Sequence, residues 1–268
     1  MTYRSKLAAL LAASTAAACS TTPVEPEPEL ELTDSYEYRI DLWVDASAHR
    51  GDTILFDDEI EEYSDATPLA NTILGQSAGG ASGTAFSSVE PLEITTGADV
   101  RTGAHADVWV DAEGEAEWGL NRCGYPVGTP FRIVATMAAA SAAVATGDFP
   151  ASDGSGGFDV SVGVRVRTGG AAAWTTAGDA HVTTDDNNGY TWTWDEGSFL
   201  DPDDQDVTAF FQGFDGGSST RDSPPLVVGS DGCIQIEAGL ETEATVHADT
   251  PESLQVSGSY SLSVQIET

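Results

Sequence analysis

Strict alternation of apolar and polar residues is the main pattern along this chain. It is clearest in five segments, which carry aliphatic residues at nearly every second position: 39–47, 100–112, 158–167, 234–247 and 256–266. A period of two places apolar side chains on one face of a strand and polar side chains on the other. Strands with one buried and one solvated face are typical of antiparallel sheets. These segments therefore predict an all-β protein built from antiparallel strands.

Two other segments carry a weaker pattern. Residues 129–146 are rich in alanine, but Phe131, Ile133 and Met137 repeat with a period of two, which predicts a long strand. Residues 54–63 fit either a strand or a helical turn. Counting both, the chain has ten or more strands and little helix outside its first residues. Two antiparallel sheets packed face to face, a sandwich of jelly-roll type, would bury the apolar faces most simply.

Glycine, serine and asparagine mark the expected turns. The Gly- and Ser-rich stretches at residues 76–83 and 152–157 predict loops. The pair Asn188-Gly189 is typical of a tight hairpin, here between strands at about 180–184 and 190–195.

The first residues have the layout of a cleaved export signal. Arg4 and Lys6 precede a short apolar run, and small residues lead to Cys19. Ala16, Ala17 and Ala18 before this cysteine resemble the lipobox of bacterial lipoproteins, which implies a diacylglycerol on the Cys19 thiol. The family usually has a larger aliphatic residue in the place of Ala16. The same alanines also fit an ordinary signal peptidase, so secretion stays an alternative.

The number of cysteines favours lipidation. The chain has three, Cys19, Cys123 and Cys233, and an odd thiol in an oxidising compartment needs a partner or a modification. Lipidation of Cys19 leaves Cys123, in an expected loop, and Cys233, at an expected strand start, to form one disulfide. Because no other stretch is long and apolar enough to span a bilayer, the lipid is the expected membrane contact.

A short acidic segment follows the expected lipid. Residues 20–34 contain three prolines and five acids, a composition that predicts an extended tether. The domain boundaries expected from sequence are therefore an export signal at 1–18, a lipidated cysteine and tether at 19–34, and one acidic β-sandwich at 35–268.

The charge of the chain limits its partners. After Cys19 it carries eight arginines and no lysine, against 44 acids. Nucleic acid is excluded as a partner because no basic footprint exists to replace counterions on phosphate. A surplus of this size predicts a saline habitat or bound divalent cations. No cofactor is required, but Ca²⁺ has a candidate loop, in which alternate acids offer oxygen ligands: Asp201, Asp203, Asp204 and Asp206.

Aromatic residues supply a candidate site for a sugar ligand. Tyr190, Trp192 and Trp194 fall on one face of an expected strand, where a row of rings can form a platform for sugars. The alternative, which we favour, is that the row fills the core. The four histidines, His49, His105, His181 and His247, lack metal-ligand spacing, and no nucleophile elbow is present. His105 and His247 are expected on the solvated face of their strands.

The second half of the chain resembles a known group of proteins. GTPFRIVATMAAASAAVATG (128–147) and EAGLETEATVHADTPESLQVSGSYSLSVQI (237–266) resemble β-sandwich domains of bacterial exported proteins of the PEP-CTERM or "choice-of-anchor" kind. The resemblance implies a surface protein and supplies no catalytic residues. The chain departs from this group because no apolar sorting segment follows Ile266.

The sequence thus favours a non-catalytic exported lipoprotein that presents an acidic β-sandwich at the cell envelope in a surface, matrix or adhesion role. It would be anchored by lipid to a bacterial membrane, on the periplasmic or cell-surface side, with an extracellular glycan or another surface protein as partner. The first alternative is a carbohydrate-binding module. The second is a jelly-roll enzyme acting on glycosides, which requires a cleft with two converging carboxylates.

Overall fold

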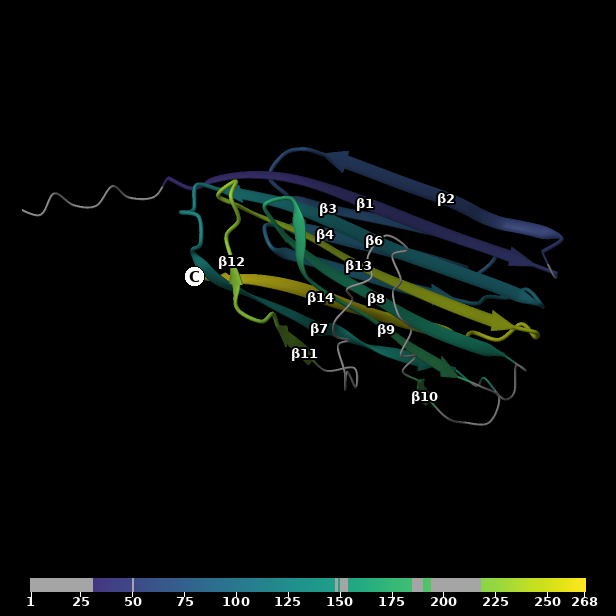
Figure 1. Ribbon diagram of the computed structural model, residues 1–268. Helices are drawn as coiled ribbons and strands as arrows, with labels where there is room; N and C mark the ends of the chain where they lie inside the picture. Colours follow the sequence, from purple (N-terminus) through teal and green to yellow (C-terminus); the bar gives the residue numbers. More distant parts are fainter. Residues whose placement is uncertain (1–30, 50, 148, 150–153, 185–189, 194–217) are drawn as a thin grey trace, which may run out of the picture. The chain divides into compact units, whose positions relative to one another are not determined.

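The protein folds as a sandwich of two antiparallel sheets. A computed structural model describes residues 31–49, 51–147, 149, 154–184, 190–193 and 218–268. Residues Glu31–Thr268 form one compact unit, in which fourteen strands are described. The ribbon in Figure 1 shows long strands running beside one another in two layers. The predicted all-β sandwich is confirmed.

Seven strands form the first sheet, sheet A, in the order β10-β9-β8-β13-β6-β1-β2. Their bounds are β1 (Thr33–Ala48), β2 (Thr53–Ser64), β6 (Val108–Cys123), β8 (Ser155–Thr168), β9 (Ala171–Thr184), β10 (Tyr190–Thr193) and β13 (Cys233–Ala248).

The second sheet, sheet B, has the order β11-β7-β14-β5-β4-β3, and β12 pairs with β7 beside this path. Its strands are β3 (Ala70–Ala78), β4 (Ala81–Glu90), β5 (Glu93–Arg101), β7 (Pro130–Thr146), β11 (Ser218–Asp222), β12 (Leu226–Val227) and β14 (Gln255–Glu267). Across the sandwich, β6 lies against β4 and β5, and β13 lies against β5 and β14.

The core lies between the sheets and follows the alternation of the sequence. In β1, Ile40, Leu42 and Val44 are fully buried, while the residues between them are half-buried on the outer face of sheet A. The other alternating strands bury their aliphatic residues in the same way. Since each sheet hides one face, burial of these side chains drives the pairing of the two layers.

Both ambiguous segments are strands. Residues 129–146 correspond to β7 and residues 54–63 to β2. The predicted hairpin is present in its paired part, because Tyr190 in β10 lies opposite Thr184 in β9. Its Asn-Gly turn lies outside the described residues.

The continuous strand predicted for residues 100–112 is wrong. β5 ends at Arg101 in sheet B, and β6 begins at Val108 in sheet A. Asp107, with φ of 54°, adopts the left-handed conformation in the connection. Ala104 and Ala106 continue the apolar alternation although neither lies in a strand, which is why the pattern concealed the break.

Three expected loops are also wrong in their extent. β8 begins at Ser155, inside the loop expected at residues 152–157. β3 and β4 extend into residues 76–83 and leave only Gly79 and Gly80 as the turn. Both glycines have positive φ, 60° and 87°, as a type I′ hairpin turn requires. Cys123, expected in a loop, is the last residue of β6.

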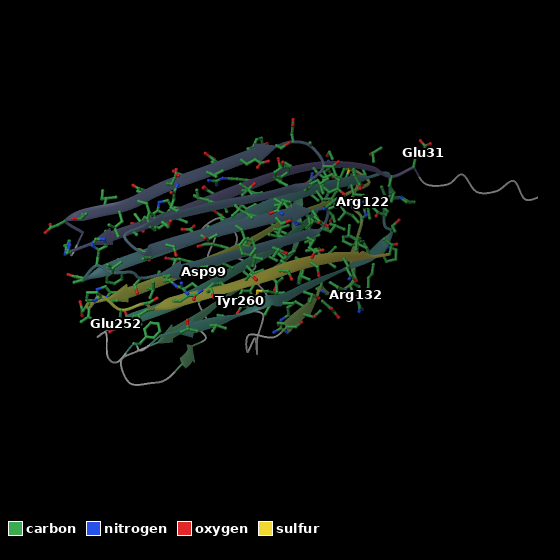
Figure 2. All side chains as sticks on the ribbon, turned by 180° about the vertical axis from the view of Figure 1, so that it is seen from behind. Glu31, Asp99, Arg122, Arg132, Glu252 and Tyr260 are labelled. Atoms are coloured by element: carbon green, nitrogen blue, oxygen red, sulfur yellow. A yellow bond between two sulfur atoms is a disulfide. The ribbon has the colours of Figure 1, made fainter. Side chains whose placement is uncertain are left out.

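The predicted disulfide between Cys123 and Cys233 is present. The two residues lie directly opposite each other in the β6–β13 pair, with a Cα–Cα distance of 4.1 Å. At the same end, Arg122 donates two hydrogen bonds of 2.7 Å to Asp34 in β1. This contact lowers the pKa of the Asp34 carboxyl, chiefly through the hydrogen bonds from Arg122. Figure 2 shows Arg122 near this end of the strands and Glu252 at the opposite end.

Candidate binding groove

A groove crosses the outer face of sheet A. It encloses about 690 Å³, and all of its lining residues come from β1, β2, β6, β8, β9 and β13. No residue of sheet B contributes to it. Six of its lining residues also belong to the core between the sheets, so the floor of the groove is sheet A itself: Tyr38, Trp118, Val162, Val164, Ala238 and Leu240.

The middle of the groove is one row of residues that runs across six strands. Strand pairing places side by side, from β2 to β9, Tyr63, Arg39, Glu117, Gly239, Gly163 and Ala177. At about 4.8 Å between neighbouring strands, such a row spans about 24 Å. One half of the row carries large side chains and the other half carries almost none.

Glycines form the floor of the second half. The backbones of Gly163 and Gly239 do not adopt the left-handed conformation. A Cβ added to Gly163 meets nothing within 4 Å, and one added to Gly239 meets the Glu117 side chain at an ordinary 3.5 Å. The fold therefore has room for a side chain at both positions. Because glycine inside a strand weakens it, a glycine that the fold does not require often marks the close approach of a ligand.

The walls of the groove carry carboxylates and two guanidinium groups. Glu115 and Glu241 lie on one side of the glycine row, and Glu37 and Glu237 lie on the other. Arg165 contacts Glu237 at 3.4 Å. Carboxylates thus border the glycines on both sides, and Arg165 adds a hydrogen-bond donor beside Glu237.

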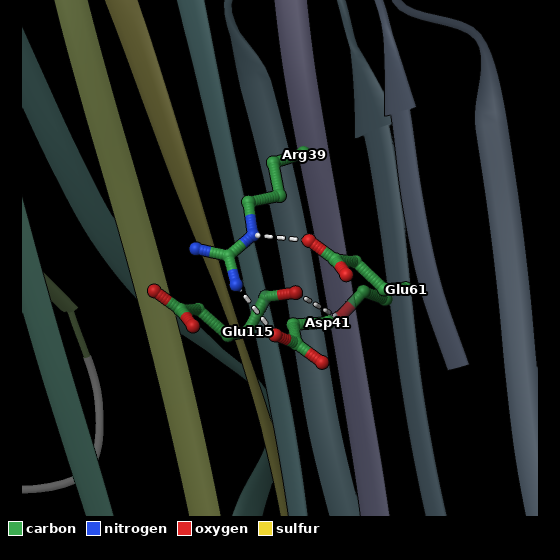
Figure 3. A network of polar contacts seen from close by, with 5 residues as sticks. Arg39, Asp41, Glu61 and Glu115 are labelled. Atoms are coloured by element: carbon green, nitrogen blue, oxygen red, sulfur yellow. Dashed lines mark hydrogen bonds and ion pairs between the residues drawn. The ribbon is translucent and has the colours of Figure 1, made fainter. Parts of the chain in front are cut away.

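Arg39 is the centre of a polar network at the mouth of the groove (Figure 3). Its Nη2 donates to Asp41 Oδ2 at 2.7 Å, and its Nε lies 3.6 Å from Glu61 Oε1. Glu115 lies on the opposite side of the guanidinium from Glu61. Burial raises the pKa of Glu115, and the neighbouring Glu117 raises it further. Beside this network, Tyr63 is 67% exposed and presents its ring at one end of the row.

Further along the same face, carboxylates lie directly opposite one another. Asp45 pairs across the strands with Asp111, and Glu113 pairs with Glu243. Burial raises the pKa of Asp111 to about 7, and the charge of Asp45 and a hydrogen bond with it contribute to the shift. Burial also raises the pKa of Glu113, with the charge of Glu243 as the next cause. This region holds protons or cations more readily than an isolated carboxylate does.

Most of the site residues predicted from sequence fall outside the described part. These are Cys19, Trp194 and the acids Asp201, Asp203, Asp204 and Asp206. Tyr190 and Trp192 have described backbones in β10, but their side chains are not described, so the aromatic row stays a prediction. His247 lies on the outer face of β13, as predicted, whereas His105 lies in a bend between β5 and β6 rather than in a strand.

The groove could not be recognised from the sequence because its residues come from six strands. The available signal was glycine at outward positions of two strongly alternating strands, Gly163 in β8 and Gly239 in β13. A strand that only needs a solvated face has no reason to place glycine there.

No known protein family, curated protein or solved structure matches the chain. Within the described residues, no helix has the length and apolar character needed to cross a membrane.

Proposed function

We propose that this chain is a non-catalytic, lipid-anchored protein of the bacterial cell envelope that binds a neutral oligosaccharide in the groove of sheet A. The observation that carries the proposal is the glycine floor of the groove, bordered by carboxylates and arginines. The resemblance to exported surface proteins and the expected lipid on Cys19 agree with this role. The Cys123–Cys233 disulfide is also typical of an oxidising compartment outside the cytoplasm.

The chemistry of the walls suits a sugar. Hydroxyl groups donate hydrogen bonds to carboxylates such as Glu237 and accept them from guanidinium groups such as Arg165. The flat floor at Gly163 and Gly239 gives a pyranose ring close access to the sheet, and the exposed ring of Tyr63 offers an apolar face for stacking. A polyanion is disfavoured by the surrounding acids. A polycation would meet Arg39 and Arg165 in the groove.

Binding to immobilised glycans tests the proposal, with neutral, acidic and amino-bearing polysaccharides as separate arms. We expect neutral oligosaccharides to bind and Gly163→Val to abolish binding, because the added side chain fills the floor. Gly75→Val is the matched control, since Gly75 lies inside β3 of sheet B with an ordinary Cβ contact of 3.5 Å. Both variants should keep the thermal stability of the parent.

Two results would contradict the groove as a glycan site. One is the absence of binding to any neutral glycan, and the other is equal binding by the Gly163→Val and Gly75→Val variants. The anchor has its own test, which is mass spectrometry of the mature N-terminus. We expect Cys19 to carry acyl chains, and an unmodified or absent Cys19 would make the protein secreted.

A further inference from the structure

A second group of ligand atoms lies at the end of sheet A far from the disulfide. Asp107 directly precedes β6, and His247 and Asp249 lie at and just beyond the end of β13. The two strands pair as far as Val108 and Ala248, so Asp107, just before Val108, and Asp249, just after Ala248, are neighbours. The backbone N–H of Asp107 donates to the carbonyl oxygen of Asp249 at 3.2 Å.

We infer that Asp107, His247 and Asp249 form a binding site for a first-row transition-metal dication, for which Zn²⁺ is the reference. The inference rests on the geometry of three ligand atoms from different segments. His247 Nε2 lies 3.2 Å from Asp107 Oδ1 and 3.5 Å from Asp249 Oδ1. All three ligand atoms lie within 4.8 Å of one another.

The two distances from His247 Nε2 fit metal coordination, and at 3.2 Å the contact with Asp107 is also a hydrogen bond. Zinc bonds to imidazole nitrogen and carboxylate oxygen are about 2.0–2.2 Å, so neighbouring ligands in a tetrahedron are about 3.4 Å apart. A charge-assisted hydrogen bond between imidazolium and carboxylate is shorter, at about 2.7–2.9 Å. The distances from His247 Nε2 to Asp107 Oδ1 and to Asp249 Oδ1 are both close to this separation between ligand atoms. A water molecule would complete the coordination.

The imidazole is held in place for this role. The ring of His247 stacks on Trp109, with centroids 4.4 Å apart and an angle of 23° between the planes. The His247 and Asp107 side chains are 14% and 20% exposed, and Asp249 is 44% exposed, so the cluster opens to solvent on one side. A fixed ring and an open side are features of a site that a metal can enter.

Charge and ligand chemistry select the class of metal. Two carboxylates facing one neutral imidazole carry two negative charges, which a bound dication neutralises. Imidazole nitrogen favours zinc and its transition-metal neighbours, whereas Ca²⁺ and Mg²⁺ prefer oxygen ligands alone. Excess Ca²⁺ is therefore expected to occupy sites with oxygen ligands alone, such as the paired carboxylates of the outer face, in preference to this cluster.

Titration with Zn²⁺ in excess CaCl₂ tests the inference. Competition with a chromophoric chelator measures the affinity for Zn²⁺. The absorption spectrum of bound Co²⁺ reports whether the ligand atoms are nitrogen and oxygen. We expect one equivalent of Zn²⁺ to bind. His247→Ala and Asp107→Asn should weaken binding by about tenfold or more. Asn is chosen at 107 because it tolerates the left-handed backbone. His105→Ala is the control, since this histidine lies at the same end but outside the cluster, with its ring 6.0 Å from that of His49.

Three results would overturn the inference. These are absence of Zn²⁺ binding in excess CaCl₂, equal affinity of the His247→Ala variant and the parent, or loss of binding in His105→Ala alone. If circular dichroism shows that Asp107→Asn does not fold, the Co²⁺ spectrum of His247→Ala decides. Spectral bands that persist in that variant place the metal elsewhere.

Discussion

The outer faces of the two sheets carry different polar residues at the outward positions of their strands. On sheet B, outward positions of neighbouring strands pair small hydroxyl residues, such as Ser88 with Thr95 and Thr95 with Ser261. On sheet A, the corresponding positions pair carboxylates, such as Asp45 with Asp111 and Glu113 with Glu243. We call these surfaces the hydroxyl face and the acidic face. Both alternate strictly with buried aliphatic residues, so the fold accepts either.

The difference indicates that the acidic face is not required by the fold. Like charges directly opposite each other destabilise a sheet, whereas paired Ser and Thr side chains are neutral or favourable. Solubility alone needs far less charge than this chain carries. The carboxylates of sheet A therefore lower stability at low salt, a cost that the proposed binding of ligands or cations, or a saline habitat, would explain.

The largest effect on this comparison is expected from removal of the disulfide. Cys123 and Cys233 join β6 and β13, the two strands that carry Glu113 and Glu243. In the chain-entropy model a closed loop of this length contributes up to about 4–5 kcal/mol. The double variant Cys123→Ser/Cys233→Ser should lose that stability in urea unfolding and lose more at low salt than at high salt. An equal loss at both salt concentrations would show that the disulfide does not offset repulsion on the acidic face.

The next effect is on the pH dependence of stability. The pKa of Asp111 is about 7 in the folded protein and about 3.9 in an unfolded chain, so the folded state binds more protons between these values. Its stabilising contribution is present below about pH 4 and is lost as the pH rises through 7. Unfolding free energy should fall by about 1–2 kcal/mol from pH 5 to pH 8, after allowance for solvent screening.

Two variants assign this pH dependence. Asp111→Asn stays neutral and should remove most of the slope between pH 5 and pH 8. Asp99→Asn is the control from the hydroxyl face, where Gln255 donates to the Asp99 carboxylate at 2.9 Å. A slope that survives in Asp111→Asn would mean that other groups titrate in this range. At lower pH the sign reverses, because the lowered pKa of Asp34 makes its contribution disappear as the pH falls below about 4.

Local pattern predicted the strands because burial follows alternation. The positions of Ile40, Leu42 and Val44 predict the inner face of β1 from the sequence of that strand alone. The arrangement of strands is different, since β13 lies between β6 and β8, which precede it by more than sixty residues. Nothing local to β13 specifies those neighbours. The pairing depends on how all the apolar faces fit together in the two layers.

The candidate sites were less predictable for the same reason. Arg39 meets Glu61 and Glu115 only after β1 pairs with β2 and β6. His247 and Asp107 are 140 positions apart, and the apolar alternation across residues 100–112 hid the turn that brings them together. The disulfide was predictable because cysteine is rare in the chain and its number allows one pairing once Cys19 is assigned to the lipid.

The smallest effect concerns one pair of like charges. Glu243→Gln removes a charge opposite Glu113, so it should lower the pKa of Glu113 and stabilise the protein by about 0.5 kcal/mol at low salt. The reciprocal experiment builds such a pair on the hydroxyl face, with Ser88→Glu and Thr95→Glu, which lie opposite each other. A double-mutant cycle should give an unfavourable coupling of similar size, and NaCl should reduce both effects.

If the coupling vanished on sheet B while Glu243→Gln still stabilised the protein, burial of Glu113 rather than repulsion would explain the effect of Glu243→Gln on the acidic face. Equal values on both faces would mean that the two surfaces differ only in their residues and obey the same electrostatics.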